Sequence, residues 1–321
     1  MKKRKWIIRT IVIILFMIVI STILIRLNKS NMSMGWKKYN KDGTQILGDE
    51  NTGSLFDPNV IRDYDGMYRM YVSWRKNCAI AVSTSNDGIN WSELKIVLDK
   101  NNESGWEDEV NRATVIMKDG KYYMWYTGQS NNQSKIGYAV SEDGYVWNRR
   151  EEPVIIPEYD FEKMSVMNPY VIYENDIYKM YYAAGETYEP DVIAYATSED
   201  GINWNKYEEN PILEANKDKL SLDRFKVGAC EVIKNSNDKY NMFYIGYSDI
   251  NTARIFIAKS KDGINWKRNK IPIIYPTKGK FDSEATYKPA IIYDDENNRY
   301  LIYYNGRTEN REYIGLYYKE L

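Results

Sequence analysis

Two carboxylic acids, Asp57 and Glu231, occur in the short β-branched segments "DPNVI" and "ACEVI", where acid–base chemistry is possible. The chain contains no histidine, so proton transfer must fall to Asp, Glu or Tyr. Burial among the apolar neighbours of Glu231 would raise its pKa and keep the side chain protonated as a general acid. An ion pair with Arg112 or Lys288 is the alternative for the same side chain. Asp57 and Glu231 are therefore the pair predicted for a two-carboxyl mechanism.

Equivalent segments elsewhere in the chain place further polar residues in register with Asp57. When the segments are aligned on their Val-Ile or Ile-Ile pair, Asp57 coincides with Arg112, Asn168, Ala229 and Lys288. This set holds a carboxylate, a guanidinium, an amide and an ammonium, which is more polarity than a scaffold requires. Turn formation by Asp-Pro and Asn-Pro is the structural alternative. We predict that these residues meet at one pocket, where Arg112 and Lys288 bind substrate.

Weaker candidates flank the same segments. Glu109, in "WEDEVNR", is a substitute acid expected in a loop near the pocket. Trp74, Arg75 and Arg307 follow tyrosine-rich segments and could offer stacking and positive charge to a sugar, although solvated strand ends would look the same. The two cysteines show no metal-like spacing, and we predict neither a metal nor a cofactor.

A repeated motif indicates which elements position these residues. The pattern Ser-x-Asp-Gly-x-x-Trp ends at Trp91, Trp147, Trp204 and Trp266, with gaps of 56, 57 and 62 residues that are typical of propellers and solenoids. Five tyrosine-rich segments repeat in step, each between two further predicted strands. Asp-Gly is a hairpin signal, so the Asp is expected to hold a turn and the Trp to pack between blades. Five blades of four antiparallel strands are predicted.

The fifth blade lacks its outer strand at the C-terminal end of the chain. The segment "GWKKYNKDGTQIL", from Gly35, resembles the outer strand of another blade, so Trp36 is predicted to open the missing strand. This closure favours an all-β, five-bladed β-propeller over a solenoid. A second periodic acid precedes four of the first strands and is expected to link blades rather than to catalyse. These acids are Glu107, Glu162, Asp223 and Asp282.

The N-terminus predicts a single transmembrane helix. Residues 6–25 are almost all apolar and would span about 30 Å as a helix, and four basic residues at positions 2–5 precede them. The positive-inside rule then gives a cytoplasmic stub at 1–5, an anchor at 6–26, a linker at 27–34 and an extracellular propeller at 35–321. A cleaved signal peptide is the alternative. The net charge of -1 gives no basic field for nucleic acid.

The blade pattern resembles the five-bladed propeller glycoside hydrolases, the arabinanase, levansucrase and invertase group, and within it family 43. "FDPNVIRDYDGMYRMYVSW" from Phe56 and "MNPYVIYENDIYKMYY" from Met167 carry the likeness. The resemblance implies that Asp57 is the general base and that position 168 orients the acid. Asn168 departs from the Asp of that family, and Glu231 lies two or three residues later than the expected general acid.

Two functions remain open at this point. One is a membrane-anchored glycoside hydrolase, or a related glycan-processing enzyme, that acts on an extracellular or envelope polysaccharide through paired carboxylates. The other is a non-catalytic propeller that binds glycan in polysaccharide assembly or export, which the Asn168 and Glu231 departures favour. A sialidase-like enzyme and a protein-interaction propeller fit the sequence less well.

Overall fold

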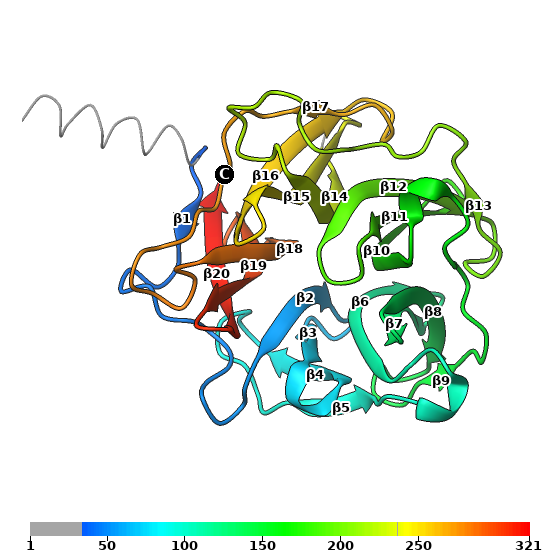
Figure 1. Ribbon diagram of the computed structural model, residues 1–321. Coiled ribbons are helices and arrows are strands. Elements are labelled where there is room, and N and C mark those ends of the chain that lie inside the picture. The colour runs from blue at the N-terminus through cyan, green and yellow to red at the C-terminus, as the bar shows by residue number, and fades with distance from the viewer. Residues whose placement is uncertain (1–33, 236) are drawn as a thin grey trace, which may run out of the picture.

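The computed structural model describes residues 34–235 and 237–321, and the chain is all-β as predicted. Five units of four strands surround a common centre in a propeller-like arrangement (Figure 1). A single parallel pair, Ser165 with Ser134, joins the second and third units into one eight-stranded sheet. Helical structure in the described residues is limited to three 3₁₀ turns of three residues each. Across the same residues, no helix is long and apolar enough to cross a membrane. The predicted anchor at 6–26 lies outside the described residues.

Each unit is built from consecutive strands, and the fifth is completed by the first strand of the chain. The first unit contains β2 (Leu55–Arg62), β3 (Tyr68–Trp74), β4 (Ala79–Ser85) and β5 (Lys95–Leu98); the second contains β6 (Glu109–Lys118), β7 (Lys121–Ser130), β8 (Gln133–Ser141) and β9 (Asn148–Arg149). The third contains β10 (Ser165–Glu174), β11 (Ile177–Gly185), β12 (Pro190–Ser198) and β13 (Asn205–Lys206). The fourth contains β14 (Lys226–Lys234), β15 (Tyr240–Asp249), β16 (Thr252–Ser260) and β17 (Lys267–Arg268); the fifth contains β18 (Ala285–Asp294), β19 (Arg299–Thr308), β20 (Arg311–Glu320) and β1 (Lys37–Lys38).

The outer strands are shorter than the inner three, because proline interrupts several of them. β9, β13 and β17 pair over two residues each, and a single further bridge forms beyond each one, for example Ile193 with Leu213. Pro153, Pro211 and Pro272 stand between the strand and the bridge and cannot donate a ladder hydrogen bond. The outer strand of each of these units is therefore held by a two-residue pairing and by one further bridge.

The repeated motif joins neighbouring units, as predicted. In the third unit, Asp200 accepts hydrogen bonds from the backbone N–H groups of Ile202 and Asn203, both at 2.8 Å, and so holds the turn. The indole N–H of Trp125, in the preceding unit, donates to the carbonyl of Gly201 at 2.8 Å. Trp204 packs edge-on against Trp125, with ring centroids 6.1 Å apart. Each such turn is thereby fastened to the second strand of the unit before it.

The second periodic acid has a different role from the one expected. Glu162 is fully buried and accepts hydrogen bonds from Tyr182 and from Lys206, both at 2.8 Å. These partners belong to the second and fourth strands of its own unit. The equivalent acids, Glu107, Asp223 and Asp282, make the same pair of contacts with a tyrosine and a basic residue. The acids therefore join strands within a unit, and the prediction that they link blades is wrong.

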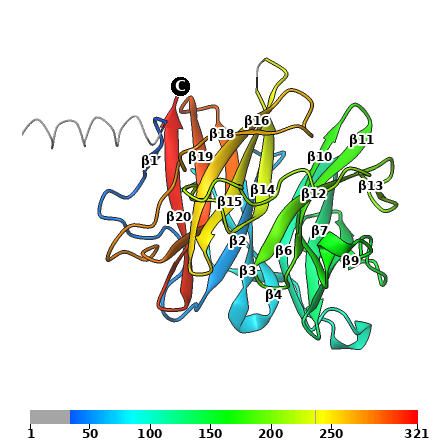
Figure 2. The same cartoon turned by 45° about the horizontal axis from the view of Figure 1, so that its top comes forward.

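The closure predicted from the sequence is confirmed. Lys37 and Lys38 of β1 pair antiparallel with Tyr318 and Tyr317 of β20. Figure 2 shows β1 beside β20, with β19 and β18 following. Trp36 is buried and packs edge-on against Phe243 of the fourth unit. The first strand of the structure thus covers the edge that the last would otherwise expose.

Candidate active site

The aligned polar residues occupy β-bulges in the innermost strands. The ladder between the first and second strands skips at this point in every unit, for example between Phe56 and Asn59. Asp57, Arg112 and Asn168 have φ angles of 49°, 55° and 49°, a left-handed conformation that is uncommon for residues with a side chain. A bulge re-aims its side chain, here toward the centre of the molecule.

Hydrogen bonds from the neighbouring unit hold this unusual backbone. Each bulge residue donates its backbone N–H to a side chain on the second strand of the preceding unit: Asp57 to Asn305 at 3.1 Å, Arg112 to Ser73 at 2.7 Å and Asn168 to Thr127 at 3.0 Å. Such contacts position the bulges relative to one another. The three bulge residues are therefore fixed by the packing of units.

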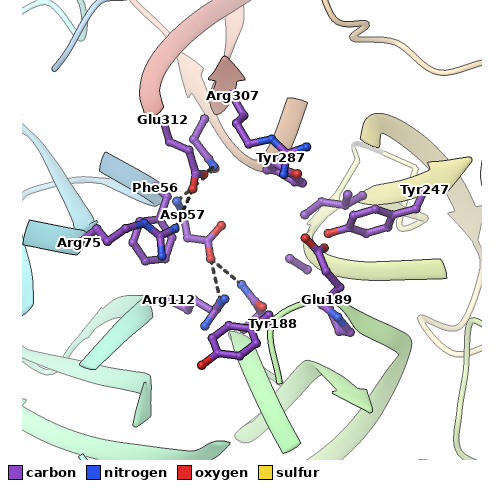
Figure 3. Close-up of a pocket in the computed structure, with 15 residues that line it drawn as sticks. Phe56, Asp57, Arg75, Arg112, Tyr188, Glu189, Tyr247, Tyr287, Arg307 and Glu312 are labelled. Carbon is purple, nitrogen blue, oxygen red and sulfur yellow. Dashed lines mark hydrogen bonds and ion pairs between the residues drawn. The ribbon is translucent and has the colours of Figure 1, made fainter. Parts of the chain in front are cut away.

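Asp57 is the centre of the site, and both of its side-chain partners were predicted. The Oδ2 atom lies 3.1 Å from Nε of Arg112 and accepts a hydrogen bond from Nδ2 of Asn168 at 3.0 Å (Figure 3). Asp57 as a whole residue is 6% exposed and is therefore buried. Both partners are donors, so they suit Asp57 in its carboxylate form. Asn168 thus orients Asp57 through a neutral amide.

A polar cavity of about 190 Å³ opens beside Asp57; we call it the central cavity. Its lining combines aromatic side chains, three arginines and three carboxyl groups. The lining residues are Phe56, Asp57, Arg75, Arg112, Asn168, Tyr188, Glu189, Pro190, Ala229, Ile245, Tyr247, Tyr287, Asn305, Arg307 and Glu312. Aromatic faces with convergent charged groups are the usual make-up of a site for a polar organic ligand.

Glu189 was missed by the sequence analysis and is a candidate proton donor. It precedes β12 in the third unit and extends into the central cavity beside Tyr247 (Figure 3). Burial raises the pKa of Glu189, while the Tyr247 hydroxyl and the charges of Arg112 and Arg307 oppose that rise. A glutamate with a raised pKa and an aspartate that line the same cavity can divide the acid and base roles between them.

Glu312 is a second carboxyl group that the sequence analysis missed. It lies on β20, where Oε1 is 2.7 Å from Nη2 of Arg75 and Oε2 accepts a hydrogen bond from Asn305. Burial raises the pKa of Glu312 and the charge of Asp57 adds to that rise, whereas Arg75 lowers it. Because two donors already hold Glu312, it is better suited to orienting Asn305 than to giving up a proton.

Glu231 does not line the central cavity. It is 2% exposed and accepts hydrogen bonds from the backbone N–H of Ile291 at 2.8 Å and from Nδ2 of Asn59 at 3.3 Å. Nζ of Lys288 lies 3.8 Å from Oε1, which is the alternative that the sequence left open. Burial raises the pKa of Glu231 to about 7, with Lys288 opposing. The geometry gives no support to Glu231 as general acid, and that role stays a prediction.

The remaining predicted residues divide between the central cavity and other places. Arg307 lines the cavity and lies over the ring of Tyr287 at 5.4 Å. Lys288 is fully buried, with Nζ 3.3 Å from the carbonyl oxygen of Pro58. Trp74 donates its indole N–H to the carbonyl of Thr52 at 2.8 Å, and Glu109 lines a separate cavity. Contact of Lys288, Trp74 or Glu109 with substrate therefore has no support in the geometry.

In the described parts of the chain, no group of three or more His, Cys, Asp or Glu side chains could hold a metal ion. The lining residues of the central cavity that can act as acids or bases include three carboxyl groups, and three arginines supply positive charge.

Comparisons with known proteins place the chain among carbohydrate-processing enzymes. The family model Glyco_hydro_130, described as beta-1,4-mannooligosaccharide phosphorylase, matches residues 129–317, more than half of the chain. A 1,2-beta-oligomannan phosphorylase from Thermoanaerobacter sp. (strain X514) is 30% identical over 209 residues. That alignment covers 64% of this chain and 62% of the relative, so less than two thirds of the relative is represented.

Solved structures show the same fold at low sequence identity. One comes from work on family 130 mannoside phosphorylases, described as containing hydrolases that target β-1,2 mannosidic linkages in Candida mannan. It has a TM-score of 0.70 at 16% identity and covers 88% of this chain and 93% of its own. A thermostable family-43 glycoside hydrolase has a TM-score of 0.67 at 20% identity and covers 85% and 90%.

The resemblance to family 43 was thus close in fold, but the specific family is a different one of related architecture. The match over residues 129–317 includes Asn168, which departed from the family-43 pattern. The chain belongs to glycoside hydrolase family 130.

Proposed function

We propose that this chain is a membrane-anchored, five-bladed β-propeller enzyme that hydrolyses a β-mannosidic linkage in an extracellular or envelope glycan. Membership of family 130 supports glycan processing, and the name of the Thermoanaerobacter relative supports a β-linked mannoside. The apolar N-terminal segment supports the anchor at 6–26 and the extracellular position of 35–321.

The observation that carries the proposal is the pair of carboxyl groups in the central cavity. Asp57 extends from the first unit with two donors on Oδ2, and Glu189 extends from the third with a raised pKa. In the proposed reaction, Glu189 gives its proton to the glycosidic oxygen as the C–O bond breaks. Asp57 takes a proton from the water whose oxygen attacks the anomeric carbon.

Charge pairing favours water over phosphate as the attacking group. Each arginine that lines the central cavity has a carboxylate partner: Arg112 with Asp57 at 3.1 Å, Arg75 with Glu312 at 2.7 Å and Arg307 with Glu284 at 3.2 Å. A phosphate dianion would have to compete with these carboxylates for its donors. Phosphorolysis is the second candidate, because the matching family model and the relative are both described as phosphorylases.

Product identity tests the proposal. The full chain in detergent is incubated with β-1,2- and β-1,4-mannobiose, with and without inorganic phosphate, and the products are separated by chromatography. We expect mannose in both conditions. Mannose 1-phosphate formed only with phosphate would establish phosphorolysis instead, and binding without any product would point to the glycan-binding alternative.

Substitutions at the two carboxyl groups test their roles. Asp57→Asn and Glu189→Gln should each lower kcat by roughly 10²- to 10⁴-fold, the usual contribution of a general acid or base. Glu152→Gln, on an exposed residue outside the central cavity, is the matched control. Full activity of Glu189→Gln would remove Glu189 as the proton donor.

A further inference from the structure

A second, larger cavity adjoins the central cavity between the fourth and fifth units; we call it the lateral cavity. Its volume is about 680 Å³, against about 190 Å³ for the central cavity. Arg307 lines both cavities and therefore stands at the wall between them. It is held there by the carbonyl of Asn251 at 2.8 Å and by Glu284 at 3.2 Å. A ligand that occupied both cavities would contact Arg307.

Arg254 gives the lateral cavity a positive charge that no carboxylate neutralises directly. It lies on β16 and donates from Nη1 to the Ser248 hydroxyl at 2.9 Å. No Asp or Glu in residues 34–235 or 237–321 comes within ion-pair distance of it. Glu284 lines the same cavity but is paired with Arg307. In the central cavity, by contrast, every lining arginine has a carboxylate partner.

Asp249 favours the Arg254 cation from beyond ion-pair distance, and the Ser248 hydroxyl that accepts from Arg254 donates in turn to Asp249 at 3.0 Å. Arg224 acts in the opposite direction and has the smaller influence, so Arg254 keeps a positive charge that is balanced only indirectly. Burial lowers the pKa of Arg254, because removal from water disfavours the charged guanidinium. The other lining groups include the amides of Asn251 and Asn310, which can hydrogen-bond a polar ligand.

The repeat shows that the fold does not require this arginine. Arg254 pairs with Gly246, and the equivalent positions in the second, third and fifth units hold Lys135, Val192 and Tyr313. Tyr275, another lining residue, corresponds to Ile156 in the second unit and Glu214 in the third. A basic residue recurs at this position only as Lys135 of the second unit, and Tyr275 has no tyrosine counterpart in the second or third unit.

We propose that the lateral cavity is an oxyanion subsite, in which Arg254 binds a phosphate or carboxylate group of a ligand that also occupies the central cavity. This assignment rests on the proposed function, because it specifies that the glycan proposed as substrate carries an anionic group. Arg254 donates charge-assisted hydrogen bonds to the oxyanion, and Tyr275 and the amides contact the rest of the ligand.

Calorimetric binding to the full chain tests the subsite without depending on turnover. The probes are β-1,2-mannobiose, the same disaccharide carrying a 6-phosphate, and inorganic phosphate alone. We expect the phosphorylated disaccharide to bind about tenfold more tightly than the neutral one, the value of one charge-assisted hydrogen bond. Arg254→Gln should abolish that difference, and Lys135→Gln, at the equivalent position of the second unit, should retain it.

The outcomes distinguish free phosphate from a phosphate group on the glycan. They also distinguish failure of the subsite from failure of the proposed hydrolysis. Arg254-dependent binding of inorganic phosphate, with no gain for the phosphorylated disaccharide, would identify free phosphate as the source. Equal binding of both disaccharides and no Arg254-dependent binding of phosphate would overturn the subsite. Tight Arg254-dependent binding without cleavage would retain the subsite while removing the proposed hydrolysis.

Discussion

The buried Glu231 predicts a specific dependence of stability on pH. Its pKa is raised to about 7 in the folded chain, above the ordinary value of 4.5, mainly by burial. Between these two pH values the folded state holds a proton that the unfolded state releases. The contribution of protonated Glu231 to the free energy of unfolding is therefore complete below about pH 4.5 and is lost as the pH rises through about 7. The melting temperature of the native chain should fall from pH 5 to pH 8 relative to Glu231→Gln, measured by circular dichroism. Parallel melting curves for the two proteins would contradict this.

At the same scale, the sequence predicted one side of the site and missed the other. Asp57, Arg112 and Asn168 were identifiable because their segments align on a repeated Val-Ile pair. Glu231 was predicted at the same site as Ala229 because residues two apart on a strand share a face. Such residues nevertheless lie about 7 Å apart along the strand. Ala229 therefore lines the central cavity, whereas Glu231, further along the same strand, does not. Glu189 reaches the cavity from a non-repeating connection, "GETYEPD", where no pattern indicates direction.

The hydrogen bonds between units can be tested at the level of a single turn. Tyr181, on β11 of the third unit, is fully buried and donates its hydroxyl to the carbonyl of Gly263 at 3.1 Å. Tyr181→Phe should destabilise the chain by about 1–3 kcal/mol, because a buried carbonyl loses its partner. Urea unfolding measures the change, with Tyr64→Phe, on an exposed ring, as the control. An equal change in the two variants would mean that the hydroxyl contact carries no particular weight.

Element boundaries were predictable where the repeat was strong. The three inner strands of each unit followed from the tyrosine-rich segments and the flanking β-branched ones, as did the Asp-Gly turns. The outer strands proved much shorter, two residues in β9, β13 and β17, because a following proline removes a donor. The periodic acids failed as predicted links since a spacing cannot tell whether a side chain turns toward its own unit or the next one.

Closure of the ring makes Trp36 a test of the whole molecule. Its side chain is 5% exposed and packs against the fourth unit, while its strand completes the fifth. Trp36→Ala should lower the free energy of unfolding by about 3–5 kcal/mol, the usual cost of removing a buried tryptophan. Lys37→Ala, on the exposed neighbour, should leave it unchanged in the same chemical denaturation experiment. An equally small change in both variants would show that the Trp36 side chain contributes little to the closed ring.

The pairing of Lys37 with Tyr318 also has a consequence for how the chain is made. A ribosome adds about 5–20 residues each second, so roughly 15–60 s separate the synthesis of the two partners. During that interval β1 has no strand to pair with, and the Trp36 side chain lacks its fourth-unit neighbour Phe243 until most of the interval has passed. The nascent chain must therefore protect its beginning until its end has emerged, and a translation product that stops early would be a substrate for quality control rather than a smaller folded protein.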